Sequence, residues 1–198
     1  MAEIYKEIQT EANSEFTEQK SKFLGFAFPV YDEQEIKSIL ARLRAEHPNA
    51  NHVCYAYRLG ERYDHYRFSD DGEPGGTAGR PIFGQIEAFD LTNILVASVR
   101  YFGGVKLGTG GLVSNYQKSA KVTLESAQII EKQIMEAVTF LYDYDVTNDV
   151  QKLLHDFGIT DVTTEYLEQC SCTVRLDIDR IEELKSAIEQ NHRLVLVK

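Results

Sequence analysis

Two glycine-rich stretches hold the residues of this chain whose types and spacing suit chemistry. The first, "SDDGEPGGTAGRPI" (residues 69–82), runs three carboxylates into a glycine-rich turn that ends in Arg-Pro. The second, "RYFGGVKLGTGGLVSNYQKSAK" (residues 100–121), has basic residues on both sides of five glycines. Glycines at this density usually serve a tight backbone turn or a ligand that the backbone approaches closely. Anion binding, cation binding and catalysis therefore compete here with a purely architectural role.

The second stretch has the chemistry of an anion site. A strand is expected before it and a helix after it, so backbone N–H groups and the helix dipole would face the loop. Arg100 and Lys106 add positive charge. The alternative, which stays open, is that the glycines only permit positive φ and close helix–sheet packing. The residues predicted to bind phosphate or nucleic acid are Arg80, Arg100, Lys106, Gly108, Thr109, Gly110, Gly111, Ser114 and Lys118.

The first stretch fits no common phosphate loop. It lacks the terminal Lys-Ser/Thr of a P-loop, and its glycines miss the dinucleotide pattern. Asp70, Asp71 and Glu73 are the candidates for holding a cation such as Mg²⁺ or sharing a proton. On a turn, however, carboxylates more often cap a helix or stay solvated, and an ion pair with Arg80 is expected before a metal site. The sequence predicts no metal and no cofactor.

Nucleophilic catalysis is not supported by the local sequence. Ser114, Ser119 and Cys54 are candidate nucleophiles with His52 and His65 as candidate bases, but none has the context of a nucleophile elbow. No catalytic residue is therefore predicted.

Residues 52–60 and 62–70 suggest a different surface. Tyrosines and Phe68 alternate there with Arg58, Arg62 and Arg67. Aromatic and arginine side chains on an open sheet face can stack nucleic-acid bases, although the same pattern also packs a sheet against helices.

The elements that must position these residues follow from hydrophobic periodicity. In the first two-thirds, strands are expected within 14–30, a helix over 32–48, a hairpin over 52–70, a buried strand over 93–103 and a helix over 108–127. Thr77 is the expected N-cap of a further helix. The last third has apolar residues at helical spacing over 146–158 and 180–191, with four strands, over 133–145, 159–169, 170–179 and 192–198. Its order is βαββαβ, a ferredoxin-like arrangement. The fold class is α+β, with domains 1–132 and 133–198.

Composition and charge limit the partners and the cellular compartment that the sequence predicts. The chain has 198 residues and a formal net charge of −10, which makes it a poor generic polyanion binder. Residues 80–121 nevertheless have a net charge of +3, and residues 137–198 one of −6, so regulation of a protein partner through the acidic end is a further hypothesis. No apolar run approaches the roughly 18 residues of a membrane helix, which predicts a cytoplasmic protein that contacts no membrane. Cys170 and Cys172 are expected to pack on one strand face, unoxidised.

Three blocks together resemble the IMPACT family in its YigZ-like bacterial form: "HVCYAYRLG", "DGEPGGTAGRPI" and "RYFGGVKLGTGGL". The resemblance implies a two-layer α/β N-terminal domain of the RNase PH and ribosomal-protein type. A ferredoxin-like domain similar to the last domain of elongation factor G would follow it. Eukaryotic relatives regulate translation.

The predicted function is a non-enzymatic regulator of translation or stress that binds RNA, the ribosome or a translation partner. The alternative is a small phosphate- or nucleotide-binding protein or enzyme that uses both glycine-rich loops with a cation.

Overall fold

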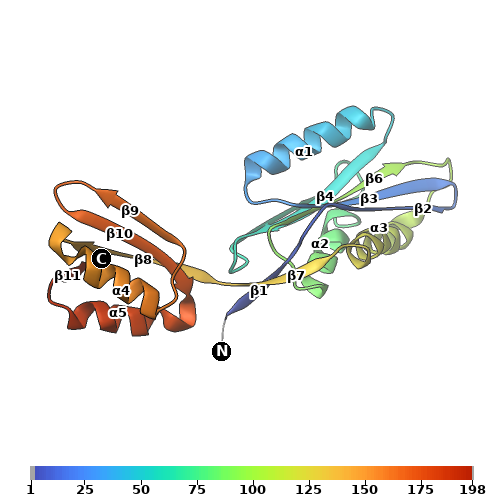
Figure 1. Cartoon of the computed structure of the whole chain (residues 1–198). Coiled ribbons are helices and arrows are strands. Elements are labelled where there is room, and N and C mark those ends of the chain that lie inside the picture. Colours follow the sequence, from blue (N-terminus) through green and yellow to red (C-terminus); the bar gives the residue numbers. More distant parts are fainter. Residues whose placement is uncertain (1–2, 198) are drawn as a thin grey trace. The chain divides into compact units, whose positions relative to one another are not determined.

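The computed structural model describes residues 3–197, which belong to two compact units (Figure 1). One unit is Tyr5–Lys132, and the other consists of Gln133–Lys198 together with Met1–Ile4. Both units combine helices with sheet, so the chain is a mixed α+β protein of two domains. None of the helices found between residues 3 and 197 has the length and apolar character needed to cross a bilayer.

A five-stranded antiparallel sheet forms the centre of the first unit. Its strands are β2 (Ala12–Glu18), β3 (Ser21–Pro29), β4 (His52–Leu59), β5 (His65–Ser69) and β6 (Ile94–Tyr101). They lie in the order β2-β3-β6-β4-β5. The central strand β6 is buried along nearly its whole length, as its continuous apolar run predicted.

Helices cover both faces of this sheet (Figure 1). On one face α1 (Glu33–Glu46) buries Ile36 and Leu43 in a core that includes Val53 and Tyr57 of β4. On the other face α2 (Gly79–Ala88) and α3 (Gly108–Glu125) share a second core with Cys54. The expectation of a two-layer domain is therefore wrong for this unit, because β4 alternates apolar residues toward two helical layers.

The same alternation buries the β4 part of the aromatic and arginine surface suggested by residues 52–70, whereas the aromatic side chains of β5 stay exposed. Tyr57 is buried beneath α1 and its hydroxyl donates to Glu33 Oε1 at 2.8 Å. On the opposite face, the Arg58 guanidinium donates to the backbone carbonyls of Leu91 and Ile86. These side chains of β4 stabilise the packing of the unit and are not displayed for nucleic acid.

The helix starts differ in how they are capped. Asp32 accepts a hydrogen bond from the N–H of Glu35 and so caps α1. Thr77 does not cap α2, contrary to the sequence-based expectation. Instead the Asp70 carboxylate accepts from the N–H groups of Ala78 and Gly79, at 2.9 and 2.8 Å. The Asp70 carboxylate thus caps α2 in place of the Thr77 hydroxyl.

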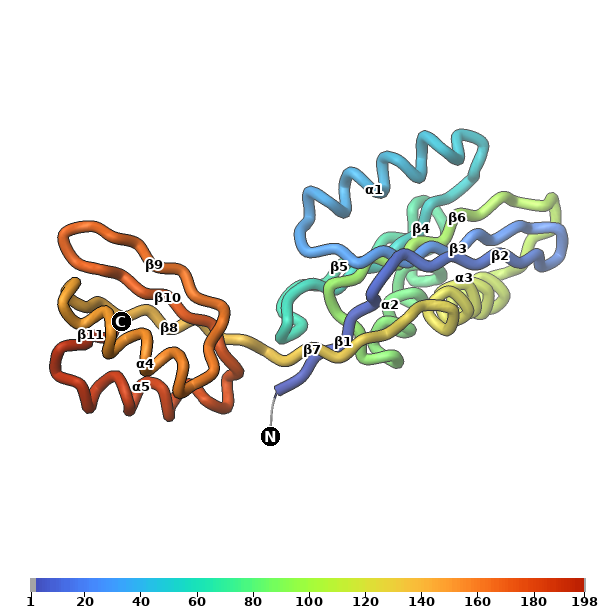
Figure 2. Tube along the Cα trace, viewed as in Figure 1, coloured from blue at the N-terminus to red at the C-terminus, as the bar shows by residue number. Residues whose placement is uncertain are grey.

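Strands β1 (Ile4–Ile8) and β7 (Ile129–Gln133) pair in a separate two-stranded sheet, which was not expected from the sequence (Figure 2). Glu7 of β1 is 2% exposed and its carboxylate lies 2.5 Å from Lys132 Nζ. Tyr31 adds a hydrogen bond to the same carboxylate. A buried charge that is paired in this way interrupts the apolar pattern from which a strand is predicted.

The second unit has the predicted βαββαβ order. It contains β8 (Met135–Tyr142), α4 (Thr147–Asp156), β9 (Val162–Tyr166), β10 (Cys170–Asp177), α5 (Ile181–Gln190) and β11 (Leu194–Leu196), with short 3₁₀ turns at Tyr144–Val146 and Ile178–Arg180. The antiparallel strand order is β11-β8-β10-β9. Cys170 and Cys172 are both buried on the core face of β10, which confirms their predicted packing on one strand face.

Candidate functional site

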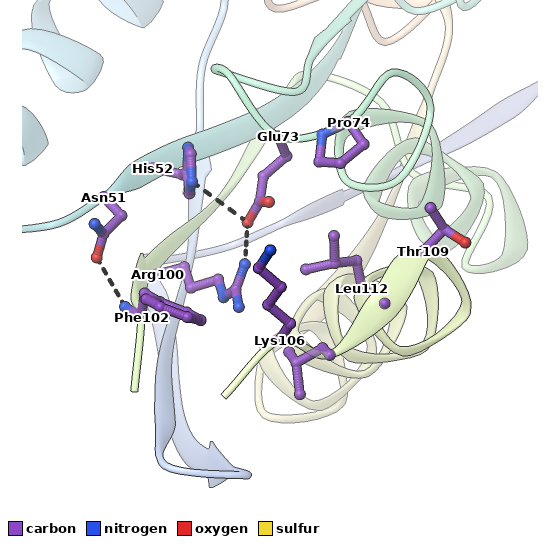
Figure 3. A pocket seen from close by; sticks show the side chains of 11 residues that line it. Asn51, His52, Glu73, Pro74, Arg100, Phe102, Lys106, Thr109 and Leu112 are labelled. Atoms are coloured by element: carbon purple, nitrogen blue, oxygen red, sulfur yellow. Dashed lines mark hydrogen bonds and ion pairs between the residues drawn. The ribbon is translucent and has the colours of Figure 1, made fainter. Parts of the chain in front are cut away.

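A cleft of about 460 Å³ lies in the first unit where the two glycine-rich stretches meet (Figure 3). Its walls come from the start of β4, the loop between β5 and α2, the end of β6 and the first turn of α3. The lining residues are Asn51, His52, Glu73, Pro74, Arg100, Phe102, Lys106, Leu107, Gly108, Thr109 and Leu112. The tertiary fold therefore brings residues about fifty positions apart in the sequence to one site.

A buried ion pair forms one wall of the cleft. Arg100 Nη1 lies 2.6 Å from Glu73 Oε1, and the two side chains are only 5% and 4% exposed. The hydroxyl of Tyr116 donates to the same carboxylate oxygen at 2.7 Å. Arg100 Nη2 donates to Ser21 Oγ at 3.3 Å, whereas Arg100 Nε is buried and has no hydrogen-bond partner in the described part of the chain. Nε is thus the guanidinium nitrogen whose N–H remains without an acceptor among the described residues.

His52 extends this polar wall. Its Nδ1 lies 2.8 Å from the backbone oxygen of Asp71. Because a carbonyl oxygen only accepts, Nδ1 carries the proton of that bond, and Nε2 of the neutral ring is left as an acceptor. Nε2 lies 3.8 Å from Glu73 Oε1 (Figure 3). The hydrogen bond to the Asp71 carbonyl therefore fixes the His52 ring, and Nε2 faces Glu73.

The opposite wall is positively charged. Lys106 is exposed at the cleft and has no ion-pair partner among residues 3–197. Helix α3 begins two residues later, with no capping side chain and no acidic residue in its first turn. Its N-terminal N–H groups and dipole therefore present positive charge. Since Arg100 and Glu73 neutralise each other, Lys106 gives the lining a net charge of +1 when His52 is neutral.

The glycines of the second stretch have separate roles. A Cβ at Gly103 would lie 2.0 Å from the backbone of Lys20, so this glycine lets the segment after β6 pass close to the turn between β2 and β3. Gly108 has φ of +73°, a conformation that favours glycine. Gly110 has neither constraint, because a Cβ there would meet nothing within 4 Å. Architecture thus accounts for Gly103 and Gly108 but not for Gly110.

The three carboxylates of the first stretch are not brought together. Asp70 caps α2, and Asp71 accepts two hydrogen bonds from Arg44, at 2.7 and 3.2 Å, and one from the N–H of Val53. Glu73 alone lines the cleft, and it is paired with Arg100. Between residues 3 and 197 there is no group of three or more His, Cys, Asp or Glu side chains able to hold a metal ion. The cation hypothesis therefore has no ligand set here.

The environment of Asp70 also changes its acidity. Burial raises the pKa of this carboxyl, but the backbone N–H donors of Gly76, Gly79 and Ala78 outweigh burial and lower the pKa below its usual value. Asp70 therefore stays ionised as a helix cap.

Cys54 has the opposite environment from a reactive cysteine. Its side chain is fully buried, and Sγ donates to the backbone oxygen of Asp70 at 3.0 Å. Burial raises the pKa of the thiol well above its usual value, and the neighbouring Tyr116 only partly opposes this. A thiol held in its protonated form is a weak nucleophile, so this residue supplies no catalytic group to the cleft.

Four of the nine predicted binding residues line the cleft: Arg100, Lys106, Gly108 and Thr109. The other five, which are Arg80, Gly110, Gly111, Ser114 and Lys118, are not among its lining residues. The expected ion pair of Arg80 with the first loop is wrong, because its guanidinium lies 3.7 Å from Glu87 of its own helix. Lys118 packs over the Phe16 ring at 4.5 Å, and the Ser114 hydroxyl donates to the Gly110 carbonyl.

Several cleft residues were missed as binding residues. Asn51 accepts a hydrogen bond from the N–H of Phe102 at 2.8 Å and so fixes the segment after β6. Phe102 is 45% exposed although it is a large aromatic. An aromatic residue directly before Gly103-Gly104 was the one available signal, whereas Pro74, Leu107 and Leu112 gave none because apolar residues at such positions usually belong to the core.

Two α+β units and a basic cleft at the glycine-rich start of a helix define a two-domain protein suited to binding an anionic ligand. The family model described as the Impact N-terminal domain matches residues 19–124, a range that contains every residue lining the cleft. The chain belongs to the IMPACT family, which confirms the resemblance of the two glycine-rich blocks.

Relatives extend this similarity beyond the matched domain. The chain is 30% identical over 172 residues to the IMPACT family member YigZ of Escherichia coli, covering 86% of this chain and 84% of the relative. It is 32% identical over 156 residues to YvyE of Bacillus subtilis, covering 79% and 72%. The crystal structure of a hypothetical protein aligns over 100% of this chain and 98% of its own, with 26% identity and a TM-score of 0.77. Both units therefore have a counterpart in a solved structure.

Proposed function

We propose that the chain is a non-enzymatic regulator related to translation or stress, and that it binds RNA, free or within the ribosome, through the cleft. The observation that carries the proposal is the unpaired Lys106 beside the uncapped N-terminus of α3. Phosphate groups bind to this combination of a cationic side chain and free backbone N–H groups. A local positive site also explains how a chain of net charge −10 can bind a polyanion.

The polar side chains of the cleft favour binding over catalysis. The Glu73 carboxylate accepts from both Arg100 and Tyr116, so it is committed to neutralising a buried charge. The thiol of Cys54 is buried and protonated. Neither is poised as a base or a nucleophile.

Family membership supports the translational setting in the cytoplasm, because the resemblance implies translation regulators among the eukaryotic relatives. We also propose that the first unit is related to RNase PH and ribosomal-protein domains, and that the second is ferredoxin-like. The strand order β11-β8-β10-β9 with two helices on the core side supports the second assignment.

A small phosphate compound or nucleotide is the second candidate ligand. The cleft volume of about 460 Å³ favours it, since small-molecule sites commonly measure roughly 300–1,000 Å³. A cation held by the first glycine-rich stretch is not supported, because Asp70 and Asp71 have other partners.

The test is the salt dependence of RNA affinity. Fluorescence anisotropy with a single-stranded RNA, from about 50 to 200 mM salt, should show affinity falling as salt rises. Lys106→Ala should weaken binding and reduce the slope of log K against log salt by about 0.7, the loss of one phosphate contact on a single strand.

Lys121→Ala is the matched control. Lys121 lies on α3 outside the cleft and pairs with Glu125 at 3.8 Å, so its loss should leave the slope nearly unchanged. Absence of RNA binding at low salt, or equal slopes for Lys106→Ala and the wild type, would refute the proposal. Binding of free nucleotides with no binding of RNA would favour the second candidate.

A further inference from the structure

We infer that the cleft takes one unpaired nucleotide of RNA, with its phosphodiester at Lys106 and the N-terminus of α3 and its base against the ring of Phe102. This inference rests on the proposed function and specifies its ligand. It predicts that the protein prefers single-stranded to double-stranded RNA.

The charge of the cleft matches one phosphodiester. Lys106 is the uncompensated side-chain charge of the lining, and the helix terminus adds roughly half a positive charge. A phosphodiester carries a single negative charge, so its charge nearly balances the positive charge of the cleft. Arg100 Nε is an independent sign of a ligand, because this donor belongs to a side chain 95% buried at the cleft and has no partner in the described chain.

Phe102 provides the surface for a base. The ring is 45% exposed, and the Arg100 guanidinium lies 5.6 Å from its centroid. Its backbone N–H is held by Asn51, so the residue is positioned before a ligand arrives. Bases of unpaired nucleotides stack on exposed aromatic rings with little dependence on sequence.

The apolar surface of the remaining wall favours an unpaired base over a duplex. Pro74, Leu107 and Leu112 give the cleft apolar surface next to Phe102, which suits a flat ring removed from water. A base inside a duplex is stacked on both sides and paired at its edge, so it cannot enter without first being extruded. A single strand offers its bases without that cost.

The experiment compares RNA forms on the full chain. Anisotropy at low salt would use a labelled oligouridine and an RNA hairpin duplex of equal length, with the wild type, Phe102→Ala and Phe102→Tyr. The wild type should bind the single strand at least about tenfold more tightly than the duplex. Phe102→Ala should lose about tenfold in affinity for the single strand, within the range measured for one stacked base. Phe102→Tyr, which keeps an aromatic face, should retain most of it.

The salt slope separates stacking from charge. Phe102→Ala removes no charge, so its slope should equal that of the wild type, whereas Lys106→Ala changes the slope. Equal affinity for the two RNA forms, or a Phe102→Ala variant that binds like the wild type, would overturn the inference and leave the proposed function standing. Failure of the wild type to bind either RNA would instead refute the proposed function. Far-UV circular dichroism of each variant excludes misfolding as the cause.

Discussion

Replacing Glu73 by glutamine removes the carboxylate that neutralises the buried guanidinium of the cleft. The two groups lie 2.6 Å apart, and their side chains are 4% and 5% exposed. Glutamine keeps the shape of the side chain and can still accept the hydrogen bond from Tyr116. The substitution therefore tests the charge of residue 73 with little change in packing.

The expected cost follows from this burial. Removing one member of a buried ion pair leaves the other charge uncompensated, which typically costs about 3–5 kcal/mol. Arg100 would keep the neutral amide oxygen of residue 73, a long bond of 3.3 Å to Ser21 and the rings of Phe23 and Phe102, but it would lose its carboxylate partner. Glu73→Gln should therefore lower the free energy of unfolding of the first unit by about 3 kcal/mol. Arg100→Met should lower the free energy of unfolding by a similar amount, since it leaves the buried Glu73 carboxylate without its cationic partner.

The double variant gives a second magnitude. If the pair is coupled, Glu73→Gln with Arg100→Met should be about 1–3 kcal/mol less destabilised than the sum of the two single variants. Additive losses would show that the two side chains act independently.

Hydrogen exchange of amides in β4 and β6 is the suitable assay, because a chain of two units need not unfold in one transition. Glu87→Gln is the control, since its ion pair with Arg80 is long and exposed and should contribute less than about 1 kcal/mol. A Glu73→Gln variant within 1 kcal/mol of the wild type would refute the account of the buried pair.

Two further predictions concern the glycine-rich stretches. The lowered pKa of Asp70 means that its contribution to stability is present above the unfolded-state pKa of about 4 and is lost as the pH falls through the folded value. Asp70→Ala should therefore cost about 1 kcal/mol at pH 7 and flatten the fall in melting temperature below about pH 4; an unchanged melting curve would contradict this. Gly110→Ala should raise the free energy of unfolding by up to about 1 kcal/mol, and with it the melting temperature, because alanine favours the helix and its Cβ meets no atom within 4 Å. A melting temperature below that of the wild type would reveal a constraint at this position.

Local patterns were sufficient to predict most elements. The helices over 32–48 and 108–127 and the βαββαβ order of the last third agree with α1, α3 and the second unit. The same holds for the buried strand over 93–103 and for the packing of Cys170 and Cys172. These predictions succeed because burial of one face imposes a period on the residues of the segment itself.

What the sequence by itself determined was therefore the elements, the family and the two stretches that meet at the site. The tertiary structure alone decided that Glu73 neutralises Arg100, that Asn51 and Phe102 line one cleft, and that α1 adds a third layer. These features join residues tens of positions apart, and no local period records them. A carboxylate on a glycine-rich turn can cap, pair or bind a cation, and only the position of the partner across the fold selects among these roles.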